Sequence, residues 1–177
     1  KSHLAWEKLN YDPNDDGLYD AYCCIWASDG LYYNSGGVAH SSAYNYRGNV
    51  MAARIAEILG EDPAPYRKEA DKILKAMNSQ LWMDDKGCWA EYKDLMGLQR
   101  LHKSPALWTV YTPIDSYACT PEQAYSATRY VDENIPHIPI KIEGEESDFY
   151  TLSTTNWMPY VWSTNNVAQA EVMHTAL

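Results

Sequence analysis

Two helical segments joined by a short, proline-rich connector constrain the fold of this chain more than any other feature. Apolar residues recur at helical spacing over residues 43–59, with Ser42 as a suitable N-cap and Gly60 as a stop signal. A second stretch, residues 66–81, places its apolar residues on one helical face. The sequence therefore predicts a helical hairpin over residues 43–82.

Further helices follow the same plan. Pro105 can occupy the first turn of a helix, which Pro113 must end or bend. Residues 120–123, Thr-Pro-Glu-Gln, combine an N-cap, a first-turn proline and the glutamine of a capping box. These signals predict helical units near residues 105–134 and 163–177. Repeated units of this kind are typical of an α/α toroid, and an irregular helical bundle with two β insertions is the alternative.

Short extended pieces separate the helical units. Residues 85–87, Asp-Lys-Gly, predict a tight turn into an extended segment over residues 88–93, whose alternation puts Trp89 and Glu91 on one side. Alternating isoleucines over residues 136–142, with two prolines, predict an edge strand. The expected fold is mostly α, with short β-hairpin insertions, in one domain that covers the whole chain.

Charge and hydropathy exclude several classes of partner. The chain carries 14 Lys and Arg against 24 Asp and Glu, a net charge of -10, with no basic cluster longer than a pair. Nucleic-acid binders display a basic surface, so we expect no nucleic-acid partner. The longest apolar run, residues 21–27, is far shorter than the roughly 20 residues that span a bilayer. We therefore expect no membrane-spanning segment.

Cysteine and histidine patterns give no support for a cofactor or a metal. The four cysteines, Cys23, Cys24, Cys88 and Cys119, form no C-x-x-C pair and are interpreted as small buried hydrophobic residues. Glu171 and His174 have metal-ligand spacing on a predicted helix, but the second helix that such a site needs is missing from the sequence. We predict no cofactor and no metal site.

The aromatic residues suggest a ligand with both apolar and polar faces. They comprise 15 Tyr, 7 Trp and a single Phe, and buried Tyr and Trp each need a hydrogen-bond partner that Phe does not. Sugars stack their C–H faces on such rings and bond their hydroxyls to polar side chains, although the same rings can also line helix contacts. The candidate stacking and hydrogen-bonding residues are Trp26, Tyr33, Arg47, Trp89, Trp108, Tyr111, Asn156 and Trp157.

A resemblance to a known family points the same way. The relevant stretches are residues 26–30, residues 40–47, and a helix ending in Leu81-Trp82 before an Asp/Gly turn and Trp89. The last of these resembles the six-hairpin glycosidases. The resemblance implies a bacterial carbohydrate-active protein with an (α/α)6 toroid that works by inversion with paired carboxylates, located in the periplasm or secreted. The sequence offers only about three of the six hairpins, so it implies part of a toroid, with the remainder as a partner.

Three carboxylates are candidates for glycoside hydrolysis, which needs an acid to protonate the leaving oxygen and a carboxylate as base or nucleophile. Glu91 is the first, because an indole beside a carboxyl raises its pKa. Asp115 is the second, near Trp108 and Tyr111, and Asp29 is the third, although Asp29-Gly30 is primarily a hairpin turn signal. The alternatives are a strand glutamate, a turn aspartate, and a non-catalytic glycan-binding or scaffold domain.

Overall fold

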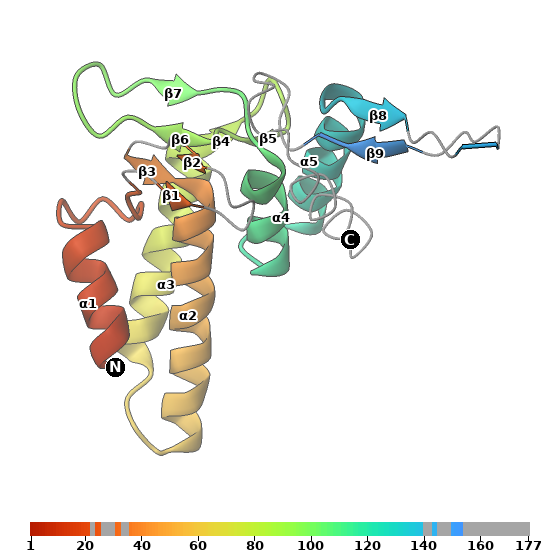
Figure 1. The fold of residues 1–177 in the computed structure, drawn as a ribbon. Coiled ribbons are helices and arrows are strands. Elements are labelled where there is room, and N and C mark those ends of the chain that lie inside the picture. Colours follow the sequence, from red (N-terminus) through yellow and green to blue (C-terminus); the bar gives the residue numbers. More distant parts are fainter. Residues whose placement is uncertain (22–23, 26–30, 33–35, 140–142, 145–149, 154–177) are drawn as a thin grey trace.

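The computed structural model describes residues 1–21, 24–25, 31–32, 36–139, 143–144 and 150–153. Its largest unit is a helical hairpin of α2 (Ala39–Ile58) and α3 (Ala64–Ala76), which lie side by side in Figure 1. A π-helical turn, η1 (Met77–Leu81), continues α3. The hairpin predicted over residues 43–82 is therefore confirmed.

The start of α2 differs from the prediction. Its N-cap is Val38 in an extended conformation, because β3 (Gly37–Val38) leads directly into the helix. Ser42 lies inside the first turn, where its hydroxyl donates to the Val38 carbonyl at 2.7 Å and accepts the Tyr19 N–H at 2.9 Å. Ser42 thus ties the preceding loop to the helix and does not cap it.

A second pair of helices, α4 (Leu107–Asp115) and α5 (Pro121–Asn134), matches the predicted unit near residues 105–134. Pro113 lies inside α4, which continues for two residues beyond it. The capping box at the start of α5 is confirmed, because Thr120 accepts the Gln123 N–H at 3.2 Å and Gln123 accepts the Thr120 N–H at 3.1 Å. The unit predicted over residues 163–177 lies outside the described residues.

Short antiparallel strands lie at one end of the helical hairpin, and one further pair, β8-β9, lies beside α5 (Figure 1). Within the described residues they form one three-stranded sheet, in the order β3-β6-β7, and three two-stranded pairs, β1-β2, β4-β5 and β8-β9. Their bounds are β1 Cys24–Ile25, β2 Leu31–Tyr32, β4 Trp82–Met83, β5 Cys88–Trp89, β6 Tyr92–Lys93, β7 Leu101–His102, β8 His137–Pro139 and β9 Tyr150–Leu152. The predicted turn at residues 85–87 joins β4 to β5, as the sequence indicated.

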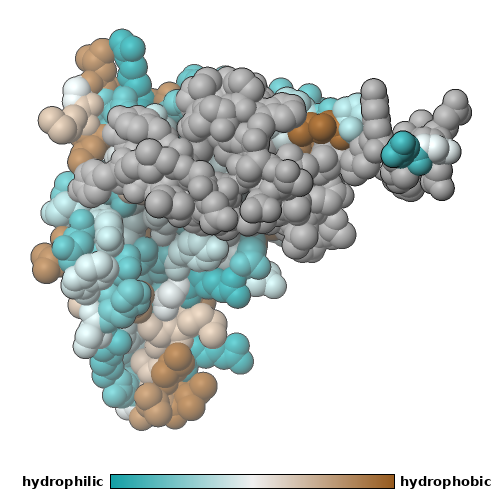
Figure 2. All heavy atoms as spheres, viewed as in Figure 1, coloured by the Kyte–Doolittle hydropathy of each residue, from teal (hydrophilic) through white to brown (hydrophobic). Residues whose placement is uncertain are grey.

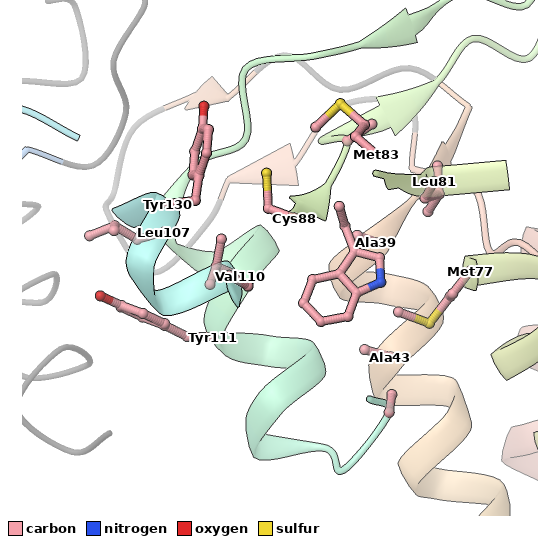
Figure 3. Close-up of a cluster of buried hydrophobic side chains, with 14 of the residues drawn as sticks. Ala39, Ala43, Met77, Leu81, Met83, Cys88, Leu107, Val110, Tyr111 and Tyr130 are labelled. Carbon is pink, nitrogen blue, oxygen red and sulfur yellow. The ribbon is translucent and has the colours of Figure 1, made fainter. Parts of the chain in front are cut away.

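The core lies where α2, α3, α4 and α5 meet the strands. Figure 3 shows Met77, Leu81, Cys88 and Val110 directed into this cluster from η1, β5 and α4. Cys88 is buried and Cys119 is half-buried, and both thiols are free, which agrees with their interpretation as small hydrophobic residues. The remaining helix, α1 (Ser2–Tyr11), packs against α2 at the N-terminal end of the chain.

The outer half of α2 carries exposed apolar side chains. Figure 2 shows hydrophobic residues at the end of the helical hairpin farthest from the strands. The exposed residues of α2 and its C-cap are Val50, Met51, Ile55, Ile58 and Leu59. Among the described residues, no helix combines the length and the hydropathy needed to cross a bilayer.

Candidate functional site

Glu91 lies between β5 and β6, with no exposed surface. Its carboxylate accepts hydrogen bonds from three groups at the start of α4: the Ala106 N–H at 2.7 Å, the Trp108 indole N–H at 3.0 Å and the Thr109 hydroxyl. Because the N-cap of α4 is an alanine that offers no side-chain oxygen, this carboxylate supplies the cap from a distant part of the chain. Its negative charge also suits the helix N-terminus.

The three predicted stacking residues that the structure describes belong to the core. Trp89, Trp108 and Tyr111 are 0%, 2% and 3% exposed. A ring buried on both faces fills apolar space and has no free face for a sugar. Trp108 also donates to Glu91, so the polar atom of this indole is used inside the protein.

Asp115 lies on the surface at the end of α4 and forms an ion pair with Arg47 from α2. Their side chains are 67% and 47% exposed. Arg47, a candidate binding residue in the sequence analysis, thus has a carboxylate partner within the chain. The Glu91 and Asp115 carboxylates therefore have different partners: Glu91 caps α4 and Asp115 links α4 to α2.

Five predicted site residues are not placed. Asp29, Trp26, Tyr33, Asn156 and Trp157 lie outside the described residues. β1 and β2 on either side of Asp29-Gly30 pair in antiparallel fashion, with Ile25 opposite Leu31. This pairing agrees with the interpretation of Asp29-Gly30 as part of a hairpin connection.

A hollow of about 520 Å³ lies between α1, the segment 19–21 and the first half of α2. Its lining combines phenol rings, carboxylates, a hydroxyl and an amide, and consists of His3, Leu4, Glu7, Tyr11, Tyr19, Asp20, Ala21, Ser41, Tyr44 and Asn45. None of these residues was a sequence-based candidate. The excess of tyrosine suggested a ligand with apolar and polar faces, but no pattern in the sequence indicated that tyrosine rings from α1 and α2 share one hollow.

Asp20 is the most unusual carboxylate near this hollow. It is 4% exposed, and its Oδ2 atom has no hydrogen-bond partner among the described residues. Burial raises the pKa of the Asp20 carboxyl to about 6, and the nearby Asp16 and Asp12 carboxylates contribute to the rise. A buried acid without compensation is uncommon, and such groups concentrate at functional positions.

Side chains alone form no metal site in the part of the chain that the structure describes. No group of three or more His, Cys, Asp or Glu residues is arranged to hold an ion there. Glu171 and His174, which were considered from the sequence, lie outside that part. A cation site would therefore need oxygen atoms from amides, from the backbone or from water as well.

The comparisons with known proteins support the fold class. The chain is similar to the crystal structure of a GH78 family rhamnosidase of Bacillus sp. GL1, with a TM-score of 0.56 and 16% sequence identity. The match covers 73% of this chain and 14% of that one, so the chain spans a small part of the rhamnosidase's length. The fold is mostly α and of the α/α type. No protein-family model matches the sequence, and no curated protein matches it.

Proposed function

We propose that this chain is part of a glycoside-hydrolase-like domain and binds a carbohydrate in the hollow between α1 and α2. The observation that carries the proposal is the lining of this hollow, in which Tyr11 and Tyr44 stand beside Glu7 and other polar side chains. The likeness of the fold to a rhamnosidase supports the same class of ligand.

The chemistry of the hollow suits a polyol. Phenol rings offer apolar faces to sugar C–H groups, and their hydroxyls can donate and accept hydrogen bonds. Ser41, Asn45 and Glu7 add a hydroxyl, an amide and a carboxylate. The volume of about 520 Å³ falls within the roughly 300–1,000 Å³ typical of small-molecule sites.

Replacing Tyr44 by Ala tests the hollow. Tyr44 lines it with half of its surface exposed, so its loss removes stacking area without opening the core. We expect oligosaccharide affinity to fall about tenfold, the equivalent of about 1.4 kcal/mol, as measured by calorimetric titration. Tyr125→Ala on α5, an exposed tyrosine outside the hollow, is the matched control. Equal affinities for the two variants would reject the site.

Hydrolysis by paired carboxylates is the second candidate function. It is favoured by Asp115, an exposed carboxylate held in place by Arg47. In this second candidate Asp115 acts as the base. The sequence hypothesis assigns the acid to Glu91, but the Glu91 carboxylate has no exposed surface, and its three hydrogen-bond donors favour its charged form. A separation of roughly 6.5–9.5 Å between the two carboxyls would indicate inversion, and about 5 Å would indicate retention.

Asp115→Asn separates hydrolysis from binding. Under the hydrolytic mechanism this change removes the base, and we expect the release of reducing sugar to fall at least about 100-fold. The fold should tolerate it, because an exposed ion pair contributes only about 0–1 kcal/mol. Asp132→Asn, which breaks the exposed ion pair with Arg129 on α5, is the control. Unchanged turnover in Asp115→Asn would show that Asp115 is not the base, and no turnover in the parent chain would leave glycan binding without hydrolysis as the function.

A further inference from the structure

The loop between α1 and Asp20 has the sequence pattern of a calcium-binding loop. Asp20 itself pairs with Gly37 of β3 in an isolated β-bridge. Residues 12–17 read Asp-Pro-Asn-Asp-Asp-Gly, which matches the first six positions of the D-x-[DN]-x-[DN]-G-x₅-E motif. The twelfth position, a glutamate in the motif, is Cys23 in this chain. In such loops the first, third, fifth, seventh and ninth residues supply oxygen atoms, and the sixth is a glycine in a sharp turn. Here the third, fifth, seventh and ninth residues are Asn14, Asp16, Leu18 and Asp20.

The backbone of the loop fits this pattern. The Asp12 carboxylate accepts the N–H groups of Asp16 at 3.0 Å and of Gly17 at 3.1 Å, and so closes the loop on its first residue. Gly17 has a φ of 88°, a conformation that favours glycine. Asn14, Asp16, Leu18 and Asp20 border a common space on one side of the loop.

A small cavity lies on that side. Its volume is about 10 Å³, and Asn14, Asp16, Leu18 and Asp20 line it together with Lys93 of β6 and Asp94, which follows β6. A space of roughly 10–15 Å³ holds a single water-sized particle. The lining is rich in oxygen, the ligand that Ca²⁺ prefers.

Asp20 gives independent evidence of a missing partner. Asp20 lines the cavity and is only 4% exposed. Its Oδ2 atom has no hydrogen-bond partner among the described residues. A buried carboxylate oxygen in this state carries a desolvation cost that only a donor or a cation can offset.

The cations of the neighbourhood are engaged elsewhere. Lys93 donates its ammonium group to the Gln80 side-chain oxygen at 2.8 Å. Lys8 contacts Asp12, Asp15 and Glu69. Among the described ion pairs, none involves Asp16, Asp20 or Asp94. The carboxylates of Asp16, Asp20 and Asp94 therefore outnumber the single ammonium group, that of Lys93, which lines the cavity.

We propose that this cavity binds one Ca²⁺ ion, held by the side chains of Asn14, Asp16 and Asp20 and the backbone carbonyl of Leu18. Water molecules, one of them held by Asp94, complete the six to eight oxygen ligands that Ca²⁺ takes. Only Asp16 and Asp20 are then direct acidic ligands, which agrees with the absence, among the described residues, of a group of three or more acidic side chains that could hold a metal. The ion joins the loop to Gly37 of β3 and to the segment after β6, both of which border the cavity.

Thermal unfolding of the full chain, first treated with a chelator and then titrated with CaCl₂, tests the proposal. We expect the midpoint to rise by roughly 5 °C at saturation, because an ion that binds only the folded state stabilises it. Calorimetry should give one Ca²⁺ per chain. A midpoint that does not respond to Ca²⁺, or that responds equally to Mg²⁺, would overturn the assignment.

Two variants and a control connect the response to the cavity. Asp20→Asn and Asp16→Asn should each lower Ca²⁺ affinity at least about tenfold. Without Ca²⁺, Asp20→Asn should be at least as stable as the parent, since it removes a buried charge, so loss of the response cannot be attributed to unfolding. Asp85→Asn, an exposed aspartate in the β4–β5 turn, should keep the full response. A parental Ca²⁺ affinity in Asp20→Asn and Asp16→Asn would overturn the proposal.

Discussion

Replacing Glu91 by Ala is expected to lower the free energy of unfolding by about 3–5 kcal/mol, because it leaves buried donors without an acceptor. The Ala106 N–H, the Trp108 indole N–H and the Thr109 hydroxyl all donate to this carboxylate, which has no exposed surface. Each unsatisfied donor costs about 1–3 kcal/mol. Urea-induced unfolding, followed by tryptophan fluorescence, measures the loss.

Glu91→Gln gives a graded comparison. The glutamine side chain keeps one acceptor oxygen but turns an amide N–H₂ group toward the donors, so we expect a smaller loss than for Glu91→Ala. Glu133→Ala, which removes an exposed glutamate on α5, should change stability by less than about 0.5 kcal/mol. If Glu91→Ala unfolds at the parental urea concentration, the carboxylate is not needed to cap α4 and its primary role must lie in chemistry.

The expected loss of stability in Glu91 variants affects the test of hydrolysis at this residue. The sequence hypothesis is that Glu91→Gln abolishes hydrolysis while glycan binding persists. In the structure the same substitution also weakens the start of α4, which carries Trp108 and Asp115. A loss of turnover therefore supports catalysis by Glu91 only if the variant is shown to be folded at the assay temperature.

The helices were predictable because their signals are local. The apolar period of residues 66–81 and the capping box at Thr120 act within a few residues of the chain. The start of α2 was not predicted correctly, because Val38 and Ser42 take their roles from the pairing of β3 with β6 and from the contact with Tyr19. Contacts between distant segments leave no periodic trace in the sequence.

The difference between local signals and contacts of distant segments also explains which features of the candidate site could be predicted. An extended glutamate beside aromatic residues has one sequence pattern whether it faces a substrate or caps a helix, and only the approach of α4 decides that Glu91 caps a helix here. The hollow between α1 and α2 brings Glu7 and Tyr44 together across a loop. The Asp-Pro-Asn-Asp-Asp-Gly pattern of residues 12–17 is local, but no metal site was predicted from it.

Gly36 occupies the position where a methyl group should be most damaging. Its φ is 77°, and a Cβ atom there would lie less than 3.0 Å from the Lys93 carbonyl oxygen and the Leu95 backbone nitrogen. Both neighbours are backbone atoms, so neither can turn aside as a flexible side chain would. The Gly36 carbonyl also accepts the Ala21 N–H at 2.8 Å, which fixes the glycine from its other side.

We therefore expect Gly36→Ala to destabilise the fold by about 3–5 kcal/mol, through backbone strain and overpacking together. Gly97→Ala is the matched control: its φ is 65°, but a Cβ atom there meets nothing within 4 Å, so it isolates the strain of about 1–2 kcal/mol. Urea-induced unfolding of the two variants gives the difference. If both lose the same stability, then Gly36 is required only for its backbone conformation, and β3 is not held against the segment after β6 as closely as the structure has it.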